Sequence, residues 1–171
     1  MQRISKLTGT AAIVGLGLSL SAVAPAQAAP AVGPCKDVSI EVESEPGSPG
    51  MGHYSQWILV TNKGSDACNL NGHPGVQRSV LTSSGFEQYG APAAWTNEGV
   101  VPVQLKPGET GRAILRVTQP HLYDAADCGG VVDTDALTIY LPGGTSQYNV
   151  AAHGDACSSE SLVTSTVGVF K

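Results

Sequence analysis

Apolar and polar residues alternate with a period of two along much of the chain, a pattern typical of β-strands rather than helices. In residues 36–43, Val and Ile alternate with Ser and Glu, which predicts a strand with one buried face and one face in water. Residues 57–60 (Trp-Ile-Leu-Val) form a continuous apolar run. This run predicts a central strand that is covered on both faces, with Trp57 in the core. Residues 76–82 predict a further strand, which ends in a turn at residues 83–85 (Ser-Ser-Gly).

The strongest hairpin signal lies in the middle of the chain. Residues 101–105 and 111–118 carry apolar side chains at alternate positions, and Pro102 places the first of these strands at a sheet edge or near a bulge. Residues 106–109 (Lys-Pro-Gly-Glu) put Pro and Gly at the two central positions of a type II turn. We therefore expect the two strands to pair with each other.

Further strands and two loops complete the pattern. Residues 137–141 predict a strand, its partner begins at Tyr148, and residues 162–170 predict a C-terminal strand. Residues 119–135 hold several Asp residues and are expected to form a long, solvated, acidic connection. Residues 45–52 contain two Pro and three Gly, which predicts an exposed, mobile loop.

These segments amount to about seven to nine short strands, with no helix longer than one or two turns. We therefore predict an all-β fold, specifically an immunoglobulin-like antiparallel β-sandwich. The spacing of a true immunoglobulin domain is absent, because Trp57 lies 22 residues after Cys35 and only 11 before Cys68.

The N-terminus has the three zones of a secretory signal peptide. Arg3 and Lys6 are basic, and residues 7–24 are mostly apolar or small. A retained membrane anchor is the alternative, but Pro25 breaks the segment just before an Ala-Gln-Ala cleavage motif. The cleavage site that we predict consists of Ala26, Ala28 and Ala29.

Cleavage would remove residues 1–28 and leave a short arm over residues 29–34 and one domain over residues 35–171. Without Arg3 and Lys6, seven basic residues face fourteen acidic ones, a formal net charge of −7. Such a charge disfavours binding to nucleic acid and to anionic lipid. We therefore expect a secreted, extracellular monomer with no stable membrane anchor after cleavage.

Four cysteines lie in the predicted mature chain: Cys35, Cys68, Cys128 and Cys157. An even number in an exported chain indicates two disulfides. Three pairings are open, and nearness in sequence favours Cys35–Cys68 and Cys128–Cys157. No Cys-x-x-Cys motif is present, so neither a zinc ribbon nor a thioredoxin-type redox site is expected.

Short motifs in a familiar order run along the mature chain: residues 60–62 (Val-Thr-Asn), 67–70 (Ala-Cys-Asn-Leu), 72–76 (Gly-His-Pro-Gly-Val), Leu105 with Pro107 and Gly108, Cys128, 141–143 (Leu-Pro-Gly) and Cys157. The set resembles the secreted actinobacterial domain of unknown function family 4232, from about Cys35 to Val169. The resemblance implies a β-rich extracellular domain with a signal peptide and two disulfides. It implies no reaction.

Some motif residues are expected to shape turns rather than to perform chemistry: Asn62, Gly72, His73, Pro74 and Gly75. Asn62 is expected to cap a turn that leads to Gly64, because an Asn side chain readily bonds to neighbouring backbone groups. His73 departs from the family pattern, which usually has Tyr or Phe there. The resemblance implies a structural position for His73 before Pro74.

The sequence contains no motif of catalytic, cofactor-binding or metal-binding residues. No Ser lies in a Gly-x-Ser-x-Gly motif. The four His residues lack the close spacing of a ligand pair, and the Asp residues of the acidic connection lack the spacing of a calcium loop. Trp95 is a candidate contact residue, since an exposed aromatic ring can serve as a binding platform, although it could also be packed.

We therefore expect a non-catalytic extracellular or cell-envelope domain, a binding or structural module that needs no cofactor. Its partner would be an extracellular or cell-wall ligand or protein. One alternative is a secreted protease inhibitor that presents the loop of residues 45–52. The other is a hydrolase with a noncanonical site. An exposed aromatic or apolar patch would favour the binding module, and a cleft with convergent polar groups would favour an enzyme.

Overall fold

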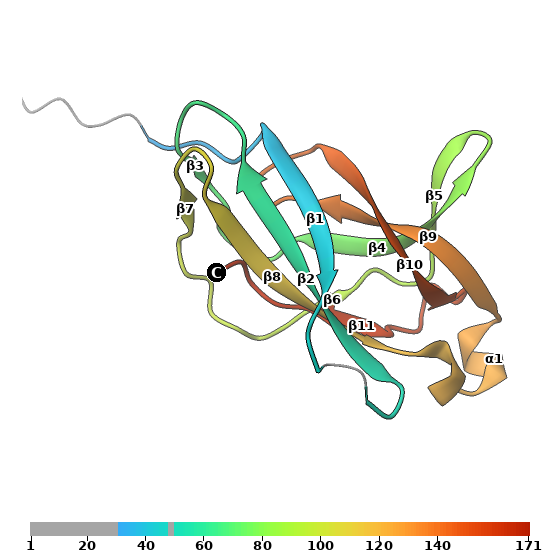
Figure 1. Cartoon of the computed structure of the whole chain (residues 1–171). Helices are drawn as coiled ribbons and strands as arrows, with labels where there is room; N and C mark the ends of the chain where they lie inside the picture. The colour runs from blue at the N-terminus through green and yellow to red at the C-terminus, as the bar shows by residue number, and fades with distance from the viewer. Residues whose placement is uncertain (1–30, 48–49) are drawn as a thin grey trace, which may run out of the picture. The chain divides into compact units, whose positions relative to one another are not determined.

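Two β-sheets face each other in the computed structural model, which describes residues 31–47 and 50–171 (Figure 1). The predicted signal peptide and its cleavage site lie outside these residues. One sheet has five strands in the order β1-β2-β8-β11-β6, and the other has four in the order β10-β9-β4-β5. A two-stranded sheet, β3-β7, completes the described strands.

The bounds of these elements show where short strands were missed. Three of the eleven described strands, β3, β6 and β7, have only two residues each, which is why the predicted number of seven to nine is too low. The elements are β1 (Val38–Ser44), β2 (His53–Asn62), β3 (Cys68–Asn69), β4 (Gly75–Thr82), β5 (Gly85–Tyr89), β6 (Ala94–Trp95), β7 (Gln104–Leu105), β8 (Thr110–Thr118), a 3-10 turn (Pro120–Leu122), α1 (Ala125–Cys128), β9 (Val131–Tyr140), β10 (Gln147–Cys157) and β11 (Ser165–Val167).

The β-sandwich prediction is confirmed. The pairings are antiparallel except that of β11 with β6, which is parallel. The core lies between the sheets and is formed by alternate residues of facing strands, such as Ile58 and Val60 of β2 and Leu137 and Ile139 of β9. Burial of these side chains supplies the main stabilisation of the fold, as expected where strands alternate inward and outward residues.

The expectation that residues 57–60 are covered on both faces is wrong. Ile58 and Val60 are fully buried, whereas Trp57 and Leu59 point to the outer face and are partly exposed. Trp57 is shielded there by Arg112 of β8, whose guanidinium lies 4.7 Å from the centre of the indole ring. A cation over an aromatic face makes a favourable contact and replaces a second packed layer.

The expected pairing of residues 101–105 with 111–118 is also wrong, although the turn between them forms. The Glu109 N–H donates to the Lys106 carbonyl, and Gly108 has a φ of 81°. However, β7 pairs with β3, and β8 pairs with β2 and β11. Asn62 at the end of β2 explains why the two segments pair with other strands. Its backbone continues the β2–β8 ladder to Gly108 and Glu109. Its side chain donates to the Leu105 carbonyl and so holds β7 apart from this ladder.

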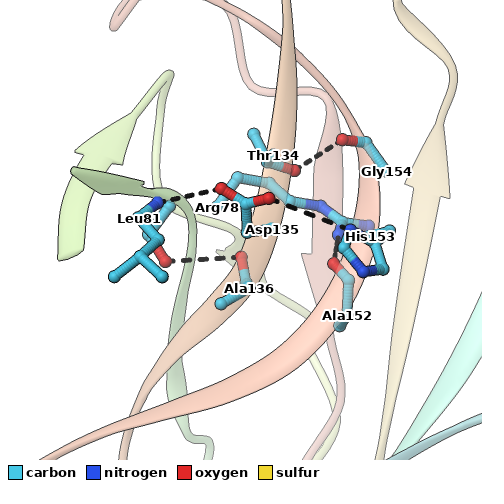
Figure 2. A network of polar contacts seen from close by, with 9 residues as sticks. Arg78, Leu81, Thr134, Asp135, Ala136, Ala152, His153 and Gly154 are labelled. Carbon is cyan, nitrogen blue, oxygen red and sulfur yellow. Dashed lines mark hydrogen bonds and ion pairs between the residues drawn. The ribbon is translucent and has the colours of Figure 1, made fainter.

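The acidic connection of residues 119–135 is shorter than expected. The 3-10 turn and α1 occupy its first part, and β9 begins at Val131. Asp133 and Asp135 therefore lie on a strand. The Asp135 side chain accepts a hydrogen bond from the Leu81 N–H at 2.9 Å and lies 4.0 Å from the His153 ring (Figure 2).

The favoured disulfide pairing is confirmed. Cys35 is bonded to Cys68, and Cys128 is bonded to Cys157. The first bond holds the segment before β1 against β3, and the second holds α1 against the end of β10. Each closes a loop of about 30 residues, 33 and 29 apart in sequence, and so restricts the unfolded chain.

One charged side chain lies inside the sandwich. Arg78 of β4 is only 8% exposed, and its Nη1 donates to the carbonyl of Ala152 at 2.7 Å (Figure 2). Its Nη2 donates to Tyr54 and Gln56 of β2, so that the guanidinium joins the two sheets. The Ala152 carbonyl is free for this bond because β10 shifts its register between Ala151 and Gly154, as a β-bulge does.

The C-terminal segment also belongs to the core. Phe170 is fully buried, and its N–H donates to the Gly72 carbonyl at 3.0 Å. Lys171 and Arg112 exchange two backbone hydrogen bonds of 2.9 Å, which continue the sheet beyond β11. Within the described part of the chain, no helix is long and apolar enough to span a membrane.

Candidate functional site

Asn62 organises one end of the sandwich. It is buried, and its Nδ2 donates to the carbonyls of Asp66 at 2.8 Å and Leu105 at 3.0 Å. Its Oδ1 accepts from the Gly64 N–H at 2.9 Å. The side chain therefore closes the turn after β2 and holds β7 beside it, which leaves no free polar group for a ligand.

The segment Gly72–Gly75 crosses the end of the sandwich beside the C-terminal segment. Gly72 has a φ of 121°, which favours glycine, and its carbonyl accepts the Phe170 N–H. Pro74 is fully buried. Gly75 pairs with Tyr140 of β9. The segment therefore lies in contact with Tyr140 and Pro142.

His73 and Trp95 form a stacked pair on this segment. Their ring centroids are 5.4 Å apart with an interplanar angle of 12°. The Trp95 Nε1–H donates to the Pro74 carbonyl at 3.2 Å, and the His73 Nε2 lies 3.4 Å from the Thr96 hydroxyl. Trp95 is nevertheless 65% exposed. The pair therefore presents an aromatic surface, and hydrogen bonds to Pro74 and Thr96 hold its orientation.

A groove of about 590 Å³ runs past this pair. Its lining brings together segments that are far apart in sequence: Asn71, Gly72, His73, Gly75, Trp95, Val100, Tyr140, Leu141, Pro142 and Gly143. A second hollow of about 260 Å³ shares Asn71, Pro142 and Gly143 with it and extends to Val32, Pro34 and Asn69. We call the two hollows together the Trp95 groove.

The lining of the Trp95 groove is mostly apolar. None of its lining residues is Asp, Glu, Lys or Arg. The Asn71 Oδ1 accepts from the Val103 N–H at 2.8 Å, and its Nδ2 has no partner among the described residues. The Tyr140 hydroxyl lies between Gln88 and Gln147. A ligand would thus meet a broad apolar surface with a few polar groups at its edges, which is typical of small-ligand sites.

Glu98 links Thr96, the neighbour of Trp95, to the C-terminal Lys171. Its Oε2 is 2.6 Å from the Lys171 Nζ, and its Oε1 accepts a hydrogen bond from the Thr96 hydroxyl. The hydrogen bond from Lys171 holds the pKa of this carboxyl below its ordinary value of 4.5. Thr96 in turn lies next to His73, so that the carboxylate belongs to the support of the groove.

We expect the Glu98 carboxyl to titrate below 4.5, because Lys171 stabilises its charged form. The Glu98–Lys171 pair then contributes to stability above the unfolded-state pKa, and this contribution is lost as the pH falls through the folded-state pKa. The effect on stability should be small, since the pair is at the surface. A carboxyl NMR titration checks this, and Lys171→Met should return the midpoint towards 4.5. A wild-type midpoint at or above that value would contradict the ion pair.

The other candidate residues do not converge on a common site. His53 lies beside Thr118, and His153 lies beside Asp135. Among residues 31–47 and 50–171, no three His, Cys, Asp or Glu side chains gather where a metal ion could be held. The described residues of the predicted inhibitory loop join the sheet through Glu45 and Gly50, and neither disulfide is attached to that loop.

Sequence reasoning selected Trp95 and the 72–75 turn but missed the opposite wall of the groove. That wall includes Asn71 and Tyr140, which no sequence motif singled out, and Pro142 and Gly143, which entered only as part of the 141–143 motif. The pairing of Gly75 with Tyr140 brings these segments together. No local pattern in the sequence predicts this pairing.

Comparison of the sequence with family models gives one match. No curated protein matches the sequence significantly. The model of one family, described as a domain of unknown function, matches residues 34–170. The match spans both disulfides, the 72–75 turn and all of the Trp95 groove except Val32. The chain therefore belongs to the family of domains of unknown function called DUF4232.

Proposed function

We propose that this protein is a non-catalytic binding module that acts outside the cell and holds an uncharged polysaccharide chain in the Trp95 groove. The observation that carries the proposal is the exposed Trp95 ring, stacked on His73 at the edge of the groove. The predicted signal peptide and the two disulfides support a location outside the cell, because disulfides persist in oxidising compartments.

The properties of the groove favour a neutral ligand with an apolar face. The Trp95 N–H already donates to Pro74, so the exposed part of the ring offers mainly its apolar surface. A sugar ring has such an apolar face, with hydroxyl groups around its edge that Asn71 and Tyr140 could bind. Since the groove lacks charged residues and the predicted mature chain is acidic, polyanions are disfavoured.

The shape of the groove favours a polymer over a single sugar. The larger hollow holds the aromatic pair, and the smaller one continues past Asn71 to the segment before β1. Cys35 anchors this segment to Cys68, and the Asn69 side chain donates to the Val32 carbonyl at 2.7 Å. A chain bound along both hollows would contact a wall that is already ordered, which reduces the entropy lost on binding.

The test uses the fluorescence of Trp95 itself. The chain has two Trp residues, so Trp57→Phe leaves Trp95 as the only strong emitter. We expect soluble β-linked glucose and N-acetylglucosamine oligomers to shift its emission saturably. In the otherwise wild-type protein, Trp95→Ala should weaken binding by at least about tenfold, because an exposed aromatic anchor commonly supplies that much. Calorimetry measures the affinities of the variants.

Phe86→Ala is the matched control, because Phe86 is a partly exposed aromatic residue on β5 of the other sheet. It should bind as the wild type does. Equal affinities of Trp95→Ala and wild type would overturn the proposal, as would the absence of any response to neutral oligosaccharides. A response only to a proline-rich peptide would replace the polysaccharide with a peptide ligand at the same groove.

A further inference from the structure

A second hollow, of about 360 Å³, lies on the outer face of the five-stranded sheet. Its floor is formed by outward-pointing residues of three neighbouring strands. Arg116 of β8 pairs with Ser55 of β2 on one side and with Thr166 of β11 on the other. His53 and Thr118 form the next pair on this face, and the lining is completed by Tyr54, Val117, Tyr123 and residues 163–165.

Arg116 differs from most other cations of the described chain. Arg78 is buried in the core, Arg112 covers Trp57, and Lys106 and Lys171 form ion pairs with Glu109 and Glu98. Within the described residues, the exposed Arg116 guanidinium has no hydrogen bond and no ion-pair partner. It lies in a hollow surrounded by hydroxyl groups, and no carboxylate lines that hollow.

Two acidic residues lie outside the hollow on neighbouring segments. Glu98 is close enough for Arg116 to act on its charge, but it is already paired with Lys171. Glu45 follows β1, and its N–H donates to the Ser55 carbonyl at 3.0 Å. Neither residue contacts the Arg116 guanidinium, so its planar set of donors remains available from the open side of the hollow.

We propose that this hollow is an oxyanion site that takes the phosphoryl or carboxylate group of a small soluble ligand. The Arg116 guanidinium would bind two oxygens side by side, the geometry in which Arg recognises such groups. The Thr166 hydroxyl flanks it as a further donor, and the Thr118 hydroxyl lies nearby, 3.1 Å from the His53 Nδ1. Tyr123 and Val163 would contact the rest of the ligand, and the volume suits a molecule of sugar-phosphate size.

The site is separate from the Trp95 groove. The two share no lining residue. They lie on neighbouring strands, because Thr166 of the hollow pairs with Ala94, the residue before Trp95. The proposal therefore holds whether or not the groove binds polysaccharide.

The test is an NMR titration of the purified protein with inorganic phosphate, glycerol phosphate, acetate and chloride at constant ionic strength. We expect saturable shifts at the Arg116 Nε–H and at the amides of Thr118 and Thr166. Arg116→Gln should weaken the affinity at least tenfold. Arg112→Gln is the matched control, because it removes the same charge from the same face of the same strand and should leave the affinity within twofold of the wild type.

The titrations distinguish a phosphoryl site, a carboxylate site and a general effect of charge. Saturation by phosphate or glycerol phosphate assigns the phosphoryl group, and saturation by acetate alone assigns the carboxylate. Stronger binding of glycerol phosphate than of inorganic phosphate would indicate that Tyr123 and Val163 contact the organic part. Equal losses in the two Arg variants would show a general charge effect and overturn the site. Shifts that do not saturate, or that chloride reproduces, would also overturn it.

Discussion

Replacement of Arg78 by alanine should lower the free energy of unfolding by about 3 to 4 kcal/mol. The substitution leaves Ala152, Tyr54 and Gln56 without their shared donor inside the sandwich. A buried polar group that loses its partner costs about 1 to 3 kcal/mol. The cavity left by the side chain adds to this cost, because the two sheets cannot close completely over it. Chemical denaturation monitored by circular dichroism measures the change.

Two further substitutions separate the causes of this loss. Arg78→Met refills much of the volume without a charge, and it should cost less than Arg78→Ala, because it leaves a smaller cavity. Arg112→Ala is the control, since it removes an exposed cation over Trp57 that is worth about 0.5 to 1 kcal/mol. If Arg78→Ala were as mild as Arg112→Ala, the guanidinium could not be buried in the folded protein.

Phe170→Ala should destabilise the protein by about 3 to 5 kcal/mol, the usual range for truncation of a buried aromatic side chain. Phe170 is fully buried in the core, and its N–H binds the carbonyl of Gly72. A cavity beneath Gly72 would also loosen the 72–75 turn on which the Trp95 groove rests. Thermal and urea unfolding measure the loss, and weaker emission shifts of Trp95 would report the effect on the groove.

Phe86→Ala provides the same change of side chain at a position that is 39% exposed. It should cost about 1 kcal/mol or less, as substitutions of exposed residues usually do. Similar losses in the two variants would mean that Phe170 does not hold the C-terminal segment in the core. A stable Phe170→Ala protein with an unchanged Trp95 environment would show that the groove does not depend on the C-terminal segment.

Alternation of apolar and polar residues predicted the long strands, because the apolar positions of each strand mark the face that is buried. Val38, Ile40 and Val42 point inward from β1 as a period of two requires, and the expected partner of β9 begins at Gln147, one residue before the predicted start. The short strands could not be found in this way. Two residues such as Gln104 and Leu105 show no period, and their partner depends on where a distant side chain, Asn62, places its donor.

The candidate sites were predicted less completely for a related reason. Trp95 could be selected from its residue type alone. The opposite wall depends on the register between β4 and β9, which cannot be predicted from the residues next to Trp95 in the sequence. Arg78 and Arg116 look alike in the sequence, each within an alternating strand. One points between the sheets and the other outward into a hollow, and only the fold distinguishes them.

The register of the central strands has a consequence for the time the chain needs to fold. β2 pairs with β8, so that His53 lies beside Thr118, 65 residues away, and Thr61 beside Thr110, 49 residues away. Sandwiches built from such distant pairings fold in roughly milliseconds to seconds, because a long loop must close before its contacts can form. The newly made chain therefore stays open for that time, with its cysteines accessible to oxidation and its strands unpaired.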